Sequence, residues 1–169
     1  VRKMDAEDLE FPDASFDCVL CGFALGYITN VHRTLEGIRR VLKPGCTLAL
    51  STWGEGNELA NLYRALEAEF NVLQPNLESH HLGTVDILKQ LLDSSGFSNV
   101  EITTETVKVI FDNKQEYWAQ RMPIEQVALE DLNPAGASFR RAVYGILDDY
   151  LYIDGVHEVR NVLYAVATT

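Results

Sequence analysis

Two continuous apolar runs, joined by an amphipathic segment, constrain the fold of this chain more than any other feature. The runs "FDCVLCGFAL" and "TLALSTW" are apolar at successive positions rather than at alternate ones, which is typical of strands buried on both faces of a parallel sheet. Between them lie a capping residue, Asn30, and an apolar stripe at helical spacing up to Lys43. Pro44-Gly45 then ends the helix in a tight turn, because proline fixes φ and glycine accepts a positive φ. We therefore expect a strand, a helix and a parallel strand with a right-handed crossover.

The rest of the chain continues the alternation of helices and strands. The pattern predicts, in order, a helix within 57–70, a helix over Thr84–Ser95 ended by Gly96, a strand over Asn99–Phe111, helices within 113–151 and a final strand in "NVLYAVATT". In the middle strand the apolar positions change from even to odd numbers, so we expect a bulge or kink near Thr104–Thr106. The chain is thus predicted to form an α/β layered fold as a single domain over residues 1–169.

The charge of the chain argues against two classes of partner. Of its 169 residues, 25 are acidic and 14 are basic, which gives a formal net charge of -11. Such a field repels the phosphates of nucleic acids and anionic membranes. The basic cluster of Arg39, Arg40 and Lys43 lies in the last turn of a predicted helix, where cations suit the helix dipole. We expect no nucleic acid and no membrane as partners, and a cytoplasmic protein.

Three cysteines, Cys18, Cys21 and Cys46, cannot all pair within one chain, which fits a reducing compartment. The first two form a C-x-x-C motif, which occurs in redox and zinc sites. Within a strand, however, a spacing of three sends the two side chains to opposite faces. We therefore expect no metal site here.

The residues that directly follow the strands are the first candidates for a ligand site, because doubly wound sheets bind ligands beyond the carboxyl ends of their strands. They are Asp5 and Ala6, the segment 21–27, and the segment 53–56. A carboxylate beside a backbone N–H, as at Asp5, matches the amino group and ring nitrogen of adenine. An aspartate at a strand end also serves as a turn or cap residue. "GEGNEL" imitates a dinucleotide-binding loop, but Leu59 replaces its third glycine, which argues against a phosphate site.

Two adjoining motifs carry a resemblance to a known family. "MDAEDLEFPDASFDCVL" and "IRRVLKPGCTLALSTW" resemble the class I, Rossmann-like methyltransferases that use S-adenosylmethionine (SAM), in particular the type 11 group that includes ubiquinone and menaquinone biosynthesis enzymes. "LKQLLDSSGFSNVEI" and "NVLYAVATT" are similar to the regions of that family's sixth and seventh strands. The resemblance therefore implies a partial Rossmann-like methyltransferase fold, with strands equivalent to strands 4, 5, 6 and 7 and helical lid insertions at about 54–83 and 112–156.

The resemblance also implies a set of site residues. Asp5 and Ala6 would contact adenine, and Cys21 and Gly22 would flank the methionine portion of SAM. Phe23 and Tyr27 would then face a small-molecule methyl acceptor. Tyr27 would orient this acceptor or take a proton from it, although packing at the start of a helix explains its presence equally well.

His81 is the second candidate for a catalytic base, with His80 beside it in the lid-like stretch. Neutral imidazoles near pH 7 accept protons, whereas adjacent histidines in a polar loop are usually only solvated. The lid insertions would cover the acceptor and determine which acceptor is used. Methyl transfer from a sulfonium depends mainly on alignment and on removal of water, so a base is needed only if the acceptor must lose a proton.

The family's glycine-rich loop, and the acidic residue that follows its second strand, have no counterpart in this sequence. Val1–Met4 resembles the tail of the third strand, so the fourth strand would become an uncovered edge. A second copy, another chain or an N-terminal segment would cover that edge, or the chain is a truncated remnant. Two functions follow: SAM-dependent methyl transfer to a small-molecule acceptor, or a non-catalytic module that binds a partner through its exposed strand.

Overall fold

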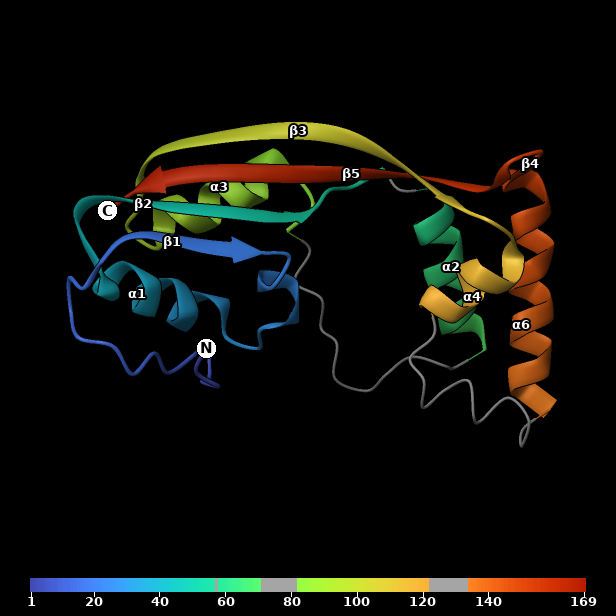
Figure 1. The fold of residues 1–169 in the computed structure, drawn as a ribbon, viewed down its shortest axis with the longest axis horizontal. Coiled ribbons are helices and arrows are strands. Elements are labelled where there is room, and N and C mark those ends of the chain that lie inside the picture. The colour runs from blue at the N-terminus through green and yellow to red at the C-terminus, as the bar shows by residue number, and fades with distance from the viewer. Residues whose placement is uncertain (57, 71–81, 122–133) are drawn as a thin grey trace. The chain divides into compact units, whose positions relative to one another are not determined.

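The computed structural model describes residues 1–56, 58–70, 82–121 and 134–169 of the chain (Figure 1). Its elements are, in order, β1 (Phe16–Gly22), the 3-10 helix η1 (Leu25–Tyr27), α1 (Val31–Val41), β2 (Leu42–Trp53), α2 (Glu58–Glu69), α3 (Val85–Ser94), β3 (Ser98–Phe111), α4 (Lys114–Arg121), α6 (Pro134–Ile146), the 3-10 helix η2 (Leu147–Tyr150), β4 (Leu151–Tyr152) and β5 (Gly155–Thr168). The chain divides into two compact units. We call Val1–Glu55, Asn76–Glu105 and Asn161–Thr169 the sheet unit, and Gly56–Pro75 with Thr106–Arg160 the helical unit.

The sheet has the strand order β1-β2-β5-β3. Strands β1 and β2 are parallel, with Leu20 opposite Ala49 and Gly22 opposite Ser51. Strand β5 lies antiparallel to β2 and pairs Tyr164 with Ser51. The predicted strand–helix–strand unit is therefore confirmed as β1, α1 and β2, and the α/β class with it.

The local signals that predict this unit act as expected. The Asn30 side chain accepts a hydrogen bond from the Arg33 N–H at 3.0 Å and so caps α1. Gly45 has a φ of 74°, in the region that glycine adopts without strain. At α3 the Thr84 hydroxyl caps the helix start, and Gly96 follows the helix with a φ of 82°.

The core of the sheet unit lies on one face of the sheet, against α1 and α3. Alternate strand residues point into it, as expected for a period of two. Its buried members come from α1 (Val31, Leu35, Ile38), α3 (Leu88, Leu92), β2 (Leu42, Leu48, Leu50), β5 (Leu163, Ala165, Ala167) and the segments between them (Leu25, Leu82, Phe97).

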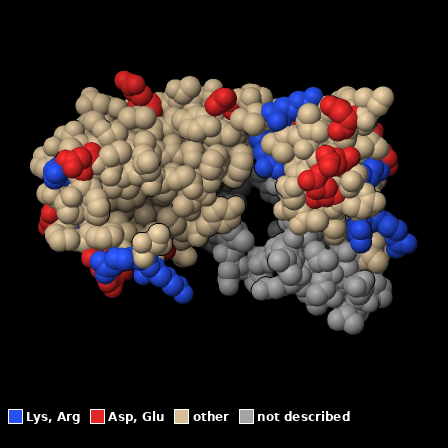
Figure 2. Space-filling view, viewed as in Figure 1, with Lys and Arg blue, Asp and Glu red and all other residues tan. Residues whose placement is uncertain are grey.

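The intervening strand residues point to the other face of the sheet, which the described residues leave largely open. On it, Leu20 is 77% exposed, Tyr164 40% and Val166 45%. Figure 2 shows that charged side chains are sparse over much of the sheet unit in this view. Strands of a parallel sheet are normally covered on both faces, so this face is an unusual feature of the chain as described.

The helical unit has its own core, which is rich in aromatic rings. Its buried members are Leu59, Tyr63, Phe111, Tyr117, Trp118, Phe139, Val143, Leu147 and Val156. Edge-to-face contacts link several of these rings, for example Phe111 with Tyr117 at a centroid distance of 5.0 Å. A buried ion pair joins Arg160 Nη2 to Glu158 Oε2 at 2.6 Å, and the Glu158 side chain is fully buried.

The structure corrects four boundaries predicted from the sequence, the first being the start of β2 at Leu42 rather than at Thr47. Residues 1–4 form no strand, because a strand requires a hydrogen-bonded neighbour and β1 pairs only with β2 among the described residues. The first apolar run leaves the sheet at Gly22 and continues into η1. The last strand begins at Gly155 rather than near residue 161, and β4 pairs with it as a hairpin. In β3 the half-buried positions change from even to odd across Thr103–Thr106, as predicted.

Candidate functional site

The carboxyl ends of β1 and β2 meet at one edge of the sheet unit, because the two strands are parallel and adjacent. Their last residues are Cys21 and Gly22 on β1, and Ser51 and Trp53 on β2. The backbone N–H of Phe23 donates to the Ser51 carbonyl at 3.0 Å and extends the pairing by one residue beyond β1. The sheet therefore brings the predicted residues Cys21, Gly22 and Phe23 beside the end of β2.

Phe23 and Trp53 form an aromatic pair at this edge. Their ring centroids lie 4.4 Å apart, with an angle of 34° between the ring planes. Phe23 has a φ of 52°, a conformation that costs a non-glycine residue about 1–2 kcal/mol. Such strain is found at sites where the surrounding structure fixes a side chain for a purpose.

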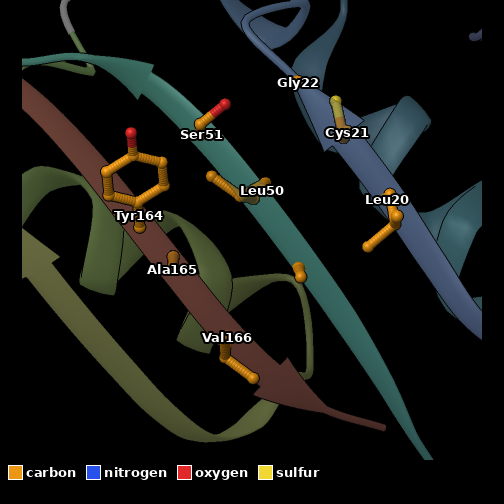
Figure 3. Close-up of a pocket in the computed structure, with 9 residues that line it drawn as sticks. Leu20, Cys21, Gly22, Leu50, Ser51, Tyr164, Ala165 and Val166 are labelled. Carbon is orange, nitrogen blue, oxygen red and sulfur yellow. The ribbon is translucent and has the colours of Figure 1, made fainter.

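A hollow of about 270 Å³ opens on the uncovered face of the sheet next to this edge (Figure 3). Strand residues from β1, β2 and β5 line it: Leu20, Cys21, Gly22, Ala49, Leu50, Ser51, Tyr164, Ala165 and Val166. The lining is mainly apolar, and the hydroxyls of Ser51 and Tyr164 are its polar side-chain groups, since the Cys21 side chain packs against the core on the other face of the sheet. This composition fits an apolar group held by few polar contacts.

Gly22 leaves the end of β1 open on this face. A Cβ atom built on Gly22 would meet only the Ser51 Oγ, at an ordinary distance of 3.9 Å. Packing within the chain therefore does not require a glycine there. Its missing side chain instead gives a ligand close access to the backbone.

Cys21 holds a neutral thiol at the same strand end. Burial raises the pKa of the Cys21 thiol, which outweighs the hydrogen bonds from the backbone of Ala24 and Leu25. A thiol with a raised pKa is a poor nucleophile near pH 7. Cys21 packs against the core of the sheet unit and is not suited to act as a nucleophile.

We expect the alkylation of Cys21 by iodoacetamide to require a higher pH than that of free cysteine. In a Cys18→Ser, Cys46→Ser variant only Cys21 remains, and its rate should rise through a pH range above the one seen for free cysteine, since only the thiolate reacts. Mass spectrometry at several pH values gives both curves. A Cys21 curve at or below that of free cysteine would show that burial does not control this thiol.

Asp5 and Ala6 lie in an exposed turn of the N-terminal segment. The Asp5 Oδ1 accepts the Glu7 N–H at 2.9 Å, and the Asp5 carbonyl accepts the Asp8 N–H at 3.2 Å. The turn role considered for this aspartate is therefore present in the structure. The exposed carboxylate is also accessible to a ligand, so its predicted contact with adenine stays a prediction.

Neighbouring residues fasten the N-terminal segment to α1. Asn30 donates its N–H to Glu7 Oε1 at 2.9 Å, and Arg33 Nε donates to the Glu7 carbonyl at 2.8 Å. Arg40 donates to the carbonyls of Phe11 and Leu9 at 2.8 and 2.6 Å. The basic cluster thus serves the fold, with Arg40 holding this segment and Lys43 paired with Asp17 at 2.6 Å.

The two candidate bases are placed differently. Tyr27 ends η1 and is 69% exposed, and its backbone N–H donates to the Ala24 carbonyl at 3.0 Å. His81 and its neighbour His80 lie outside the described residues. The proton-transfer roles of Tyr27 and His81 therefore stay predictions.

Metal and redox sites receive no support from the part of the chain that the structure describes. Within it, no three histidine, cysteine, aspartate or glutamate side chains gather as metal ligands, and all three cysteines are free. Cys18 is exposed whereas Cys21 is half-buried, as expected for side chains on opposite faces of a strand. Over the same residues, no helix has the length and apolar character needed to cross a bilayer.

Comparison with known proteins supports the resemblance seen in the sequence. Residues 1–50 match the type 11 family model described as a methyltransferase domain. The ubiquinone/menaquinone biosynthesis C-methyltransferase UbiE of Methylococcus capsulatus is 32% identical over 123 residues, which cover 59% of this chain and 46% of the relative. These matches support a SAM-dependent methyltransferase of the UbiE-like type. The UbiE protein of Proteus mirabilis is 28% identical over 123 residues, covering 64% of this chain and 49% of the relative.

Solved structures share the fold of this chain. A putative methyltransferase from Bacillus halodurans matches with a TM-score of 0.63 at 18% identity, covering 98% of this chain and 75% of that one. The YcgJ protein of Bacillus subtilis matches with a TM-score of 0.60 at 18% identity, covering 99% of this chain and 70% of that one. The partial Rossmann-like methyltransferase fold is therefore confirmed, and the chain spans about half the length of the UbiE relatives.

The cofactor of this family is SAM, and the residues present fit part of it. The exposed Asp5 carboxylate can accept from the adenine amino group. Gly22 offers open backbone at the end of β1, and its contact with the methionine portion stays a prediction, as does that of Cys21. Sequence reasoning named these residues but gave no role to Trp53, whose contact with Phe23 depends on the strand register.

Proposed function

We propose that this chain is the part of a SAM-dependent methyltransferase that aligns a small-molecule acceptor with the cofactor. The observation that carries the proposal is the juxtaposition of the β1 and β2 carboxyl ends, where Gly22 offers open backbone beside the Phe23–Trp53 pair. Ligands of doubly wound sheets bind at such strand ends. The family supplies the reaction class, and this edge supplies the surface on which it would occur.

Alignment and exclusion of water are the chain's proposed contributions to catalysis. SAM supplies a methyl group on a sulfonium, and the neutral thioether that remains after the transfer is a good leaving group. The apolar surface around Cys21 and Phe23 would strip water from the reacting atoms, and the neutral thiol would not compete for the methyl group. Tyr27, exposed at the end of η1, is proposed to orient the acceptor or to take its proton.

The acceptor is proposed to be a hydroxylated aromatic ring that is methylated at carbon. The relatives in the comparison are named as C-methyltransferases of ubiquinone and menaquinone biosynthesis. A hydroxyl group on the ring makes its neighbouring carbons nucleophilic once the proton is lost, so a single base suffices. The apolar lining of the hollow is compatible with such a ring.

Calorimetry with SAM tests the proposal. We expect the purified chain to bind SAM with measurable heat. In Gly22→Val the affinity for SAM should fall by about tenfold, because a branched side chain would occupy the open end of β1. Asp8→Ala serves as the control, since this exposed carboxylate lies outside the proposed site. Absence of heat from the chain, while a UbiE relative binds SAM in the same buffer, would contradict autonomous binding.

A second candidate function is partner binding through the edge of β1. Within the described residues β1 pairs only with β2, and Leu20 on this strand is 77% exposed. An open strand edge is a template for pairing with another chain, whether a second copy or an N-terminal methyltransferase segment. Sedimentation equilibrium distinguishes this function: a dimer that dissociates in Leu20→Lys supports it, and a monomer at all concentrations excludes self-pairing.

A further inference from the structure

The Phe23–Trp53 pair combines partial exposure with a fixed position at the carboxyl ends of β1 and β2. One part of the indole packs on Phe23, yet Trp53 remains 39% exposed. Leaving that much apolar area in water costs free energy in proportion to the area. Core packing alone therefore does not account for the tryptophan at this position.

Hydrogen bonds to residues 161, 162 and 83 hold the backbone of residues 53–55. Trp53 pairs with Val162 in the sheet, and the next residue, Gly54, donates its N–H to the Asn161 carbonyl at 2.7 Å. Asn161 Nδ2 donates to the Glu55 carbonyl at 2.7 Å, and the Glu55 N–H donates to the Gly83 carbonyl at 2.9 Å. The indole is thus carried on a rigid segment rather than on a free loop.

The backbone of Phe23 is held by β2, the strand that carries Trp53. Its N–H donates to the Ser51 carbonyl, which holds the backbone at a φ of 52° despite the steric cost. A ring held at such a cost, against a tryptophan that is itself fixed, is preorganised. The pair has the properties of a binding platform, since little side-chain entropy would be lost on stacking another ring.

The charges around the pair restrict the ligand class. Along segments 21–28 and 51–56, Glu55 is the one side chain charged near pH 7, and no lysine, arginine or histidine occurs there. Burial keeps the nearby Cys21 thiol neutral by raising its pKa. A carboxylate or phosphate would find no cation in these two segments, whereas an uncharged planar ring gains from stacking.

We infer that Trp53 and Phe23 form an aromatic shelf that binds an uncharged planar ring, and that Trp53 is the residue selecting flat acceptors over saturated ones. The inference rests on the proposed function in one respect: it assigns the ring to the methyl acceptor. The ring-binding property itself needs no cofactor. It can therefore be tested without SAM.

The test measures binding of 2-naphthol, a planar hydroxylated probe, to the full chain by saturation-transfer NMR and calorimetry. Decahydro-2-naphthol, which has the same carbon skeleton but no planar ring, is the matched probe. We expect Trp53→Leu to weaken 2-naphthol binding by about tenfold while the binding of the saturated probe changes little. Tyr152→Leu is the control variant, because Tyr152 is also an exposed stacked aromatic, 57% exposed and 4.2 Å from the His157 ring.

Two results would overturn the inference. One is equal binding of 2-naphthol by the wild type and Trp53→Leu, and the other is equal binding of the two probes by the wild type. If Trp53→Leu does not fold, as judged by its circular dichroism, Phe23→Leu takes its place with the same expectations. If the wild-type chain binds 2-naphthol but gives no heat with SAM, only the proposed function is contradicted. If it binds SAM but shows no preference for 2-naphthol, only the aromatic shelf is contradicted.

Discussion

Replacing Gly155 by alanine is expected to destabilise the helical unit by about 4 kcal/mol or more, enough to unfold it. Gly155 begins β5 with a φ of 125°, which L-amino acids with a side chain rarely adopt. An alanine Cβ there would clash with the Phe111 carbonyl oxygen and lie 3.0 Å from its carbon. Both clashing atoms belong to the backbone of β3, so no side-chain rotation relieves them.

Urea denaturation in a Trp53→Phe background measures this effect, because Trp118 is then the only tryptophan and is buried in the helical unit. Gly145→Ala is the matched control. Gly145 lies in α6, and a Cβ there meets nothing within 4 Å. Alanine at that position should be neutral or stabilising by up to about 1 kcal/mol. A Gly155→Ala midpoint equal to that of Gly145→Ala would show that the hairpin backbone shifts without cost.

The β4–β5 hairpin that depends on Gly155 was the largest error of the sequence prediction, and the reason is physical. In residues 158–159 the usual pattern is reversed: Glu158 is fully buried, whereas Val159 is 49% exposed. The hydrophobic pattern predicts the opposite faces for these two side chains, so it does not indicate a strand here. The Asp154-Gly155 dipeptide was the one local signal for the turn.

The strand–helix–strand unit could be predicted because its signals are local. Asn30 caps α1 within one turn, and Gly45 needs only its own backbone conformation. The aromatic shelf could not be predicted, since Phe23 and Trp53 are thirty positions apart and meet through the register of β1 on β2. A site built across strands becomes visible only when that register is known.

The strands of the sheet unit were predicted from the sequence, but the open face was not. Continuous apolar runs predicted strands buried on both faces, and the side of β1 that carries Leu20 is instead exposed in the described structure. The match to this chain covers about half the length of the UbiE relatives. The exposed apolar residues are the side chains that such runs would bury if this face were covered.

The Glu158–Arg160 ion pair should be the second most sensitive point of the helical unit. The two side chains project from the same face of β5, and Glu158 Oε2 accepts from Arg160 Nη2 at 2.6 Å. The Glu158 side chain is fully buried and that of Arg160 is 19% exposed. Arg160→Met would remove this cation from beside a buried carboxylate, which costs about 3–5 kcal/mol.

The double variant Glu158→Leu, Arg160→Met separates the two contributions to this cost. Removing both charges also removes the stranded carboxylate, so most of the loss should be recovered, because a buried ion pair and an apolar pair of similar volume differ little in net stability. Lys89→Met is the control. It breaks the Lys89–Asp93 pair, which is about half exposed, and should change stability by no more than about 0.5 kcal/mol. Denaturation followed by Trp118 emission measures both Glu158 and Arg160 variants, and circular dichroism follows the control. A single variant as stable as the double would show that the Glu158 carboxylate takes up a proton or reaches water once the arginine is gone.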